Sequence, residues 1–262
     1  MSRICPLFSG STGNSTYLSY ENTGILVDAG MSCKGISNAL LNVGGDIENI
    51  KAVVVTHEHT DHIKGLKTVL KKSGAILLAS SDTLETLANC DIIPNGTQVM
   101  ALDENGLCID EIGVSRFNTS HDCKGSSGYT FLMPDGKKVS VCTDLGIVTD
   151  EVRNAITGSD VVLLESNHDI EMLKRGPYPP QTKLRILSDS GHISNNACAA
   201  EVKRLFENGT ERFILGHLSL NNNTPLLALS ASESALMDLG AQNGKDYLLK
   251  VAHPKENGVT VF

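Results

Sequence analysis

Four side chains of metal-binding type lie within six residues of one another, and this cluster limits what the chain can fold into more than any other feature. The cluster has the pattern His-x-His-x-Asp-His and comprises His57, His59, Asp61 and His62. Residues 52–56, directly before it, form an apolar run typical of a buried strand. A turn at a strand end presents ligands rigidly, and short mixed tracts of His and Asp are typical of metal sites. Because so short a turn cannot aim all four side chains at one ion, the pattern indicates two adjacent metal ions.

Three later apolar runs also end in a side chain of ligand type. The strand-like segments 114–120, 138–143 and 212–215 are followed closely by His121, Asp144 and His217, respectively. One such coincidence would mean little, but three of them downstream of the first cluster predict that these strand ends converge on one site.

Strand-like runs and helical patterns alternate without a regular β-α-β rhythm, which favours a layered fold with mixed sheets. Helices are expected at 33–43, 82–88, 150–156, 195–206 and 226–239, with Ser32 and Thr149 as N-caps of the first and third. Further strands are expected at 15–18, 24–28, 75–79, 161–165, 247–252 and 259–262.

In these motifs the chain resembles the metallo-β-lactamase superfamily of metallohydrolases along nearly its whole length. The His-x-His-x-Asp-His cluster is similar to the signature of that superfamily, and residues 24–30 resemble its early strand, which ends in a structural Asp. Within the superfamily, residues 8–15 and 165–169 resemble the bacterial YycJ/WalJ group. The resemblance implies an α+β fold, a four-layer αββα sandwich of two mixed β-sheets flanked by helices, with the metals at one sheet edge. It also implies exonuclease activity on DNA from the 5′ end.

The resemblance also suggests how the ligands divide between two ions. Our hypothesis gives the first metal His57, His59 and His121, gives the second Asp61, His62 and His217, and makes Asp144 the bridge. Two dications a few ångströms apart acidify a shared water, so a bridging hydroxide would be the nucleophile. All ligand atoms are nitrogen or oxygen, so zinc, manganese and iron remain candidates.

Other polar residues are candidates for supporting and catalytic roles. Asp28 and Glu58 could orient the ligating histidines from behind, since such a histidine usually donates its second N–H to an acceptor, although Glu58 could equally be solvated. His192 lies in a loop similar to the histidine loop of the nucleic-acid-processing branches and could protonate a leaving oxygen. We place Asp61 and His168 with the catalytic groups as well, and His168 could instead be structural.

Candidate substrate contacts are Ser11, Asn14 and Asn167. Residues 9–15 lack the Gly-Lys-Ser/Thr ending of a phosphate-binding loop, so they favour a tight hairpin turn. The family resemblance supports the alternative that this turn lines the metal cleft.

Composition sets the remaining limits. The 262 residues suit one domain, 1–262, and no leader or membrane-spanning apolar run occurs, so we expect a cytoplasmic protein. Seven scattered cysteines without a Cys-x-x-Cys pair argue against a disulfide framework or a zinc knuckle. A formal net charge of -8 weighs mildly against broad electrostatic binding of nucleic acid.

Four lysines follow the ligand turn, namely Lys64, Lys67, Lys71 and Lys72. They form either a solvated helix face or a track for a phosphate backbone.

Three functions therefore remain in view. The first is a dinuclear-metal phosphodiesterase acting on nucleic acid, in particular a 5′-to-3′ DNA exonuclease. Its expected partner is DNA, and no membrane is expected among its partners. The second is a hydrolase of a small ester, lactone or thioester, which the acidic charge mildly favours. The third is a metal-bound regulatory protein without catalysis, against which the intact ligand set argues. Nothing in the sequence determines the oligomeric state.

Overall fold

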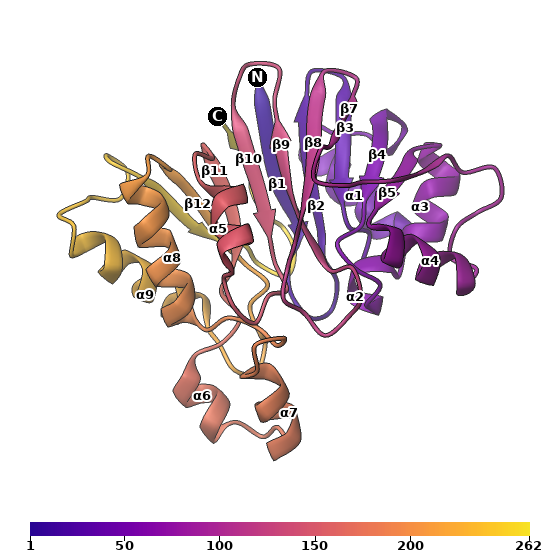
Figure 1. Ribbon diagram of the computed structural model, residues 1–262. Helices are drawn as coiled ribbons and strands as arrows, with labels where there is room; N and C mark the ends of the chain where they lie inside the picture. The colour runs from indigo at the N-terminus through magenta and orange to yellow at the C-terminus, as the bar shows by residue number, and fades with distance from the viewer.

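The computed structural model describes all residues from 1 to 262 and has four layers, with two β-sheets packed face to face and helices on both outer sides (Figure 1). Each sheet has seven strands. The expected αββα sandwich is confirmed.

The first sheet is built mainly from the N-terminal half of the chain. Its strand order is β14-β1-β2-β3-β4-β5-β6, in which β1 to β3 form an antiparallel meander and β3 to β6 run parallel. The bounds are β1 (Ser2–Phe8), β2 (Ser15–Tyr20), β3 (Thr23–Val27), β4 (Ile50–Val54), β5 (Ile76–Ala79), β6 (Val99–Ala101) and β14 (Thr260–Val261).

The second sheet repeats the same plan with the second half of the chain. Its order is β13-β12-β11-β10-β9-β8-β7, in which β7 to β10 are antiparallel and β10 to β13 are parallel. The bounds are β7 (Leu107–Ile109), β8 (Ile112–Asn118), β9 (Ser127–Leu132), β10 (Lys138–Cys142), β11 (Val161–Glu165), β12 (Arg212–Gly216) and β13 (Leu248–Val251). In both sheets, therefore, several strands have their carboxyl ends at the same edge.

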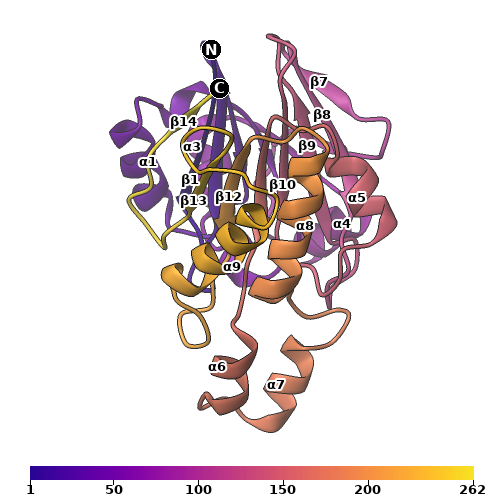
Figure 2. The same ribbon diagram turned by 90° about the vertical axis from the view of Figure 1, so that its left-hand side faces the viewer.

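The helices cover the outer faces, with one exception. They are α1 (Cys33–Asn42), α2 (Thr60–Ile63), α3 (Leu66–Ser73), α4 (Ser81–Asn89), α5 (Asp150–Ile156), α6 (Ile170–Arg175), α7 (Pro180–Ile186), α8 (Asn195–Glu207) and α9 (Pro225–Met237), with a short 3₁₀ helix at Ile47–Asn49. The exception is the pair α6 and α7, which projects beyond the sandwich in both views (Figures 1 and 2). None of the helices is both long enough and apolar enough to cross a lipid bilayer.

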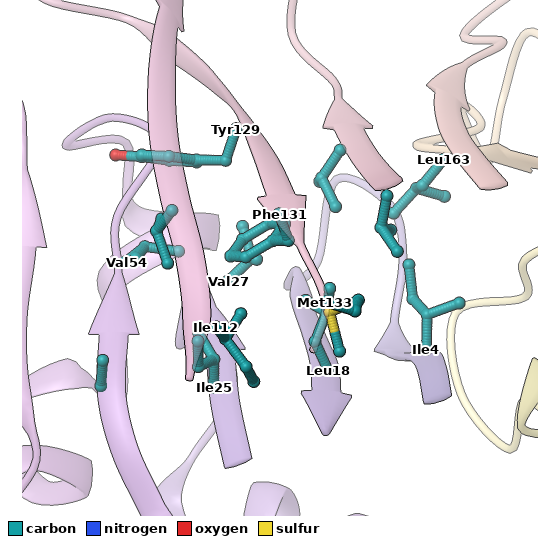
Figure 3. Close-up of a cluster of buried hydrophobic side chains, with 14 of the residues drawn as sticks. Ile4, Leu18, Ile25, Val27, Val54, Ile112, Tyr129, Phe131, Met133 and Leu163 are labelled. Atoms are coloured by element: carbon teal, nitrogen blue, oxygen red, sulfur yellow. The ribbon is translucent and has the colours of Figure 1, made fainter. Parts of the chain in front are cut away.

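The space between the sheets is filled by one apolar cluster to which both sheets contribute. Figure 3 shows Ile25 and Val54 of the first sheet against Ile112 and Phe131 of the second. Full burial of such a side chain contributes about 1.5–3 kcal/mol. Tyr129 is also fully buried, and its hydroxyl donates a hydrogen bond of 2.6 Å to the carbonyl of Val55, so the contact between the sheets includes one satisfied polar group.

Two further apolar clusters lie under the outer helices. One joins the first sheet to α1, α3 and α4, and the other joins the second sheet to α5, α8 and α9. All seven cysteines are free, and the three most deeply buried ones, Cys5, Cys142 and Cys198, belong to these clusters.

The elements predicted from the sequence mostly coincide with the observed ones. The ranges of α5 and β11 are as predicted, and Ser32 and Thr149 cap α1 and α5 by accepting hydrogen bonds from backbone N–H groups. The strand predicted at 52–56 is β4, which begins and ends two residues earlier. Val55 and Thr56 leave the strand because Thr56 turns to bind Asp28, so the turn that carries the ligands starts sooner than the apolar run suggests.

Candidate metal centre

All the predicted ligands gather at the edge where the carboxyl ends of the parallel strands meet. The first sheet supplies His57, His59, Asp61 and His62, which follow β4 and lead into α2. The second sheet supplies His121 after β8, Asp144 after β10 and His217 after β12. The site therefore depends on both sheets and on the apolar cluster that joins them.

Three imidazole rings point their nitrogen atoms at one another on one side of the site. Nε2 of His57 lies 3.0 Å from Nδ1 of His59, which lies 3.3 Å from Nε2 of His121. The three rings form a group whose ligand atoms all lie within 4.8 Å of one another. Converging ring nitrogens suit a cation, because each neutral imidazole offers a lone pair to the shared point.

A second group lies beside the first. Oδ2 of Asp61 is 3.5 Å from Nε2 of His62 and 3.8 Å from Nε2 of His217, and these residues form another group of possible ligands. Asp144 lies between the groups, since Oδ2 is 3.5 Å from Nε2 of His62 and Oδ1 is 3.9 Å from Nε2 of His121.

Two atoms of this set support the fit of the residues to metal ions. Oδ2 of Asp144 and Nε2 of His217 are buried and have no hydrogen-bond partner in the protein. Buried polar atoms are normally satisfied, and a cation held between the two groups would satisfy both atoms. The donor set of imidazoles and carboxylates is the one that divalent transition metals use, so this centre is suited to divalent metal ions.

The charges of the site divide its histidines into two kinds. Burial lowers the pKa of His57 and of His121, so both rings are neutral and ready to ligate near neutral pH. Burial opposes protonation of His62 and His217 as well, but the carboxylate of Asp144 and its acidic neighbours outweigh it, raising the pKa of His62 to about 10 and that of His217 well above its ordinary value. The protons on these rings balance a buried negative charge that dications would balance instead.

Three residues of the site have left-handed backbone conformations. Asp28, Asp144 and His217 have φ angles of 63°, 60° and 55°, each just past the end of its strand. Such conformations cost a non-glycine residue about 1–3 kcal/mol and concentrate at functional sites. Here they turn each side chain sharply from the strand direction toward the shared edge.

Asp28 contacts part of the ligand turn from behind. Its Oδ1 accepts a hydrogen bond of 2.8 Å from the backbone N–H of Thr56, and its Oδ2 accepts one of 2.7 Å from Nδ1 of His62. His62 is thereby fixed with Nε2 toward Asp61 and Asp144.

Close backbone contacts hold the ligand turn against the preceding loop. Gly30 leaves no room for a side chain, because a Cβ atom there would lie 1.6 Å from the carbonyl oxygen of Asp61. That carbonyl accepts a hydrogen bond of 2.7 Å from the backbone N–H of Asn14, and the Asn14 carbonyl accepts one of 2.8 Å from Gly30. Three loops that are far apart in sequence are thus locked around Asp61.

Glu165 is a central residue of the site that the sequence interpretation did not select. It ends β11, is fully buried, and its Oε1 accepts hydrogen bonds from Nδ1 of His192 at 2.9 Å and from Nδ1 of His217 at 2.7 Å. These contacts outweigh the effect of burial and lower its pKa to about 2. The signal in the sequence was the same as for the ligands, namely an acidic residue at the end of an apolar strand.

A cleft of about 250 Å³ opens over the two groups. Several candidate ligands line it, and of the candidate catalytic and substrate residues Ser11, Asp61, Asn167 and His192 do so as well. Asn14 lies behind it, with its Nδ2 3.2 Å from Oδ2 of Asp61 and 3.1 Å from Nε2 of His62. A larger hollow of about 500 Å³ along β7, β8 and β9 has no histidine or carboxylate in its lining, so it offers no comparable chemistry.

Two other candidates lie away from this cleft. His168 is buried, does not line the cleft, and neither of its ring nitrogens has a hydrogen-bond partner. Burial lowers its pKa to about 4. Glu58 also lies outside the lining, with Oε2 buried and unpaired. Their roles stay predictions.

The four lysines after the ligand turn do not line the cleft either. Lys67 donates a hydrogen bond to Asp91, and Lys72 donates one to Ser37. This placement favours a solvated helix face.

One wall of the cleft comes from α7 and from the turn that joins it to α6. Tyr178, Thr182, Arg185 and Ile186 line it there. Arg185 donates from Nε to Asp122, whose Oδ1 is 3.4 Å from Nε2 of His121. The sequence interpretation selected none of these residues.

The fold and this combination of imidazole and carboxylate groups define a divalent-metal hydrolase. The chain belongs to the β-lactamase superfamily, since the family model described as "Beta-lactamase superfamily domain" matches residues 23–218. It is 37% identical over 239 residues to exodeoxyribonuclease WalJ of Streptococcus pneumoniae serotype 2 strain D39, covering 89% of this chain and 88% of that protein. It is 34% identical over 250 residues to exodeoxyribonuclease YycJ of Bacillus anthracis, covering 95% and 94%. The predicted membership of the superfamily and resemblance to the YycJ/WalJ group are confirmed.

Solved structures agree on the fold. The metallo-β-lactamase fold protein YhfI from Bacillus subtilis superposes with a TM-score of 0.71 at 14% identity over 99% of both chains. PqqB from Methylobacterium extorquens superposes with a TM-score of 0.71 at 16% identity over 99% of this chain and 100% of that chain. At such identities the likeness concerns the fold alone.

Proposed function

We propose that this protein is a dinuclear-metal phosphodiesterase that removes nucleotides from DNA, starting at the 5′ end. The observation that carries the proposal is the pair of adjacent ligand groups with Asp144 between them. The similarity to two exodeoxyribonucleases over most of the chain supports DNA as the substrate.

The ligand assignment follows the two groups. His57, His59 and His121 would hold the first ion, Asp61, His62 and His217 would hold the second, and Asp144 would contact both. With nitrogen and oxygen ligands only, zinc or manganese suits the site, and iron is compatible. When bound, two such ions activate a water at neutral pH and neutralise charge that builds on the phosphate oxygens.

The residues of the chain itself supply orientation and a proton. Glu165 accepts the Nδ1–H of His192, and Nε2 of His192 makes no hydrogen bond within the protein although the side chain lines the cleft. Nε2 is therefore the atom that can protonate the leaving oxygen. Glu165 also orients His217, so one buried carboxylate positions a candidate ligand and the candidate acid together.

The residues that line the cleft favour a phosphodiester over an acyl ester as the substrate. An acyl-ester hydrolase would need an apolar mouth, but only Tyr178 and Ile186 contribute apolar side chains here. The polar remainder suits a phosphodiester, which is charged and hydrogen-bonds through its oxygens. The buried, complete set of possible ligands also favours catalysis over a purely regulatory role.

We propose further that residues 1–262 form a single domain. Both sheets contribute ligands to one site and share one apolar cluster between them, so neither half could build the centre alone.

The experiment compares metal-loaded wild type with Asp61→Ala on DNA duplexes and single strands labelled at either end. We expect release of mononucleotides from the 5′ end by the wild type and loss of that activity in Asp61→Ala. Asp150→Asn, which changes an exposed carboxylate on α5, is the matched control and keeps activity. Equal cleavage by wild type and Asp61→Ala would identify a contaminating nuclease and refute the proposal, as would ester turnover without DNA cleavage. Metal analysis of the purified protein gives the identity of the ions and their number.

A further inference from the structure

The helix pair α6–α7, residues 170–186, is the part of the molecule that the reaction described above leaves without a role. It projects from the sandwich at the edge that carries the metal centre (Figures 1 and 2). It covers no sheet, yet it supplies one wall of the cleft. Because this segment contributes little to the core but lines the cleft, a role in binding substrate explains it more simply than a role in stabilising the fold.

The charge of the pair differs from that of the rest of the chain. It contains four basic residues and one acidic residue, whereas the whole chain has a net charge of -8. Lys174, Arg175, Lys183 and Arg185 are the basic ones. A local positive charge beside the metal centre suits a polyanion, and the acidic remainder of the surface would direct that polyanion to this place.

Arg185 brings this charge to the mouth of the cleft. Its Nε donates to Asp122, which fixes the plane of the guanidinium, while neither terminal nitrogen has a hydrogen-bond partner in the protein. About half of the side chain is exposed. A guanidinium held by one edge and free at the other is prepared to bind a phosphate with two N–H groups.

Tyr178, in the turn between the two helices, is the only aromatic residue in the cleft lining apart from the histidines. Its hydroxyl accepts a hydrogen bond of 2.9 Å from Nδ2 of Asn221, and its side chain is partly exposed. The ring is therefore held at its polar end and has apolar surface available at the cleft. Nucleobases stack on such a ring without regard to sequence.

The pair is fixed relative to the reacting groups. The backbone carbonyl of Ile186 accepts a hydrogen bond of 3.0 Å from the backbone N–H of His192, and the carbonyl of Gly191 accepts one of 3.1 Å from Nδ1 of His121. A Cβ atom on Gly191 would lie 2.3 Å from the carbonyls of Arg185 and Ile186, so α7 ends directly against the histidine loop. Contacts made by α7 are thus held at a set distance from the candidate metal centre.

From these observations we propose that α6–α7 is the clamp for the terminal nucleotide of a DNA strand. Tyr178 stacks on its base, and Arg185 binds the phosphate that follows the scissile one. This assignment rests on the proposed exonuclease function and adds to it the residues that recognise the end. A cleft of about 250 Å³ is small even for a small-molecule site, which agrees with one nucleotide separated from its complement.

The test of Arg185 uses a matched arginine on the same helix pair. Arg185→Ala and Arg175→Ala each remove one positive charge, but Arg175 pairs with Glu171 and does not line the cleft. We expect Arg185→Ala to raise KM for a labelled oligonucleotide about tenfold or more while kcat changes less, and Arg175→Ala, which only reduces the local charge, to raise KM far less. The Kd for an oligonucleotide with an uncleavable phosphorothioate end, measured by fluorescence anisotropy, should rise in parallel. Equal effects of the two substitutions would refute a role specific to Arg185.

The test of Tyr178 uses the base itself. Wild type should prefer an oligonucleotide with an ordinary terminal nucleotide over one with an abasic terminal residue by about five- to a hundredfold in KM. Tyr178→Leu should lose that preference, because without the ring the base has nothing to stack on, and Tyr178→Phe should keep it. If Tyr178 had only a structural role, Tyr178→Leu would raise KM for both oligonucleotides alike and leave the ratio of the two KM values unchanged. That result would overturn the clamp.

The outcomes separate the clamp from the function on which it rests. DNA cleavage by the wild type together with wild-type ratios in Tyr178→Leu and Arg185→Ala would refute the clamp and leave the exonuclease proposal standing. Failure of the metal-loaded wild type to cleave any DNA would refute both. If Tyr178→Leu and Arg185→Ala kept wild-type DNA kinetics but lost binding to a partner protein, the helix pair would be a docking site for that protein instead.

Discussion

Nδ1 of His62 donates a hydrogen bond of 2.7 Å to Oδ2 of Asp28, and both residues are almost completely buried. This contact joins the end of β3 to the ligand turn after β4. It decides which ring nitrogen of His62 faces the candidate metal site, since the nitrogen bound to Asp28 cannot also bind an ion. A carboxylate behind a ligating histidine in this way usually raises metal affinity.

Removing that carboxylate should therefore weaken metal binding. We expect Asp28→Ala to lower the affinity for the tightest-bound divalent ion about 10- to 100-fold, with Asp28→Asn showing a smaller loss because its carbonyl oxygen can still accept the hydrogen bond. Titration against a chromogenic chelator measures the affinity, and circular dichroism checks that the fold is intact. An unchanged affinity in a folded Asp28→Ala protein would contradict this role.

A second prediction concerns Glu165 and His192. Loss of a general acid typically costs about 10²–10⁴ in rate, so His192→Ala should lower kcat by that order. Glu165→Gln should lower kcat as well, because the neutral amide holds Nδ1 of His192 less firmly. If Glu165 acts through His192, the double variant should be little slower than His192→Ala alone. Additive losses at saturating metal would show that the two residues act independently.

A third prediction concerns Gly30, where a Cβ atom would lie 1.6 Å from the carbonyl oxygen of Asp61. We expect Gly30→Ala to reduce the free energy of unfolding by about 1–3 kcal/mol or more and to lower metal affinity, because Asp61 must move. Gly258→Ala is the control, since no atom lies within 4 Å of the position of its added Cβ. Urea unfolding of both variants measures the difference, and equal stabilities would contradict the packing described here.

A fourth prediction follows from the buried ring of His168. Burial lowers its pKa from 6.5 to about 4, so the unfolded chain binds a proton here at a higher pH than the folded protein. Its contribution to stability is complete above pH 6.5 and is lost as the pH falls toward 4. Between pH 7 and pH 4.5 this should cost about 2–3 kcal/mol.

The measurement is urea unfolding at both pH values, in chelator so that metal release does not contribute. His168→Phe should lose less stability on acidification than the wild type by about that amount, whereas His253→Gln, at an exposed histidine, should behave as the wild type does. Identical pH dependence in His168→Phe and wild type would show that the ring is protonated in the folded state.

A fifth prediction tests the contact between the sheets. Phe131 is fully buried between them, so Phe131→Ala should cost about 3–5 kcal/mol of unfolding free energy through lost burial and the cavity left behind. Leu132→Ala, next to it on β9 but largely exposed, should cost far less. Denaturant titration measures both losses of unfolding free energy. Comparable losses in the two variants would contradict the burial of Phe131 between the sheets.

The candidate ligands could be predicted from the sequence because their local signals are strong. An apolar strand that stops at a histidine or aspartate places that residue at a sheet edge, and this pattern predicts that His121, Asp144 and His217 belong to one site. Glu165 carries the same signal. This signal alone does not predict its role, because a single carboxylate at a strand end gives no indication of the two histidines that approach it from elsewhere in the chain.

The helix pair α6–α7 could not be predicted from local pattern. Its helices are short, Pro177, Pro179 and Pro180 interrupt the periodicity, and it buries few side chains, so neither apolar spacing nor propensity marks it. The contact between Arg185 and Asp122 joins residues that are 63 positions apart. Such a pairing is a property of the tertiary structure and has no counterpart in any window of the sequence.

Each ligand group takes residues from both sheets, so the geometry of either ion's site would be set by how those sheets pack rather than by the turn after β4 alone. Substitutions in the apolar layer between the sheets, remote from any reacting atom, would then change the rate of the reaction by shifting the ligands of one sheet relative to those of the other. Variation in turnover among related chains should accordingly track the volume of that interior layer even where every ligand is identical.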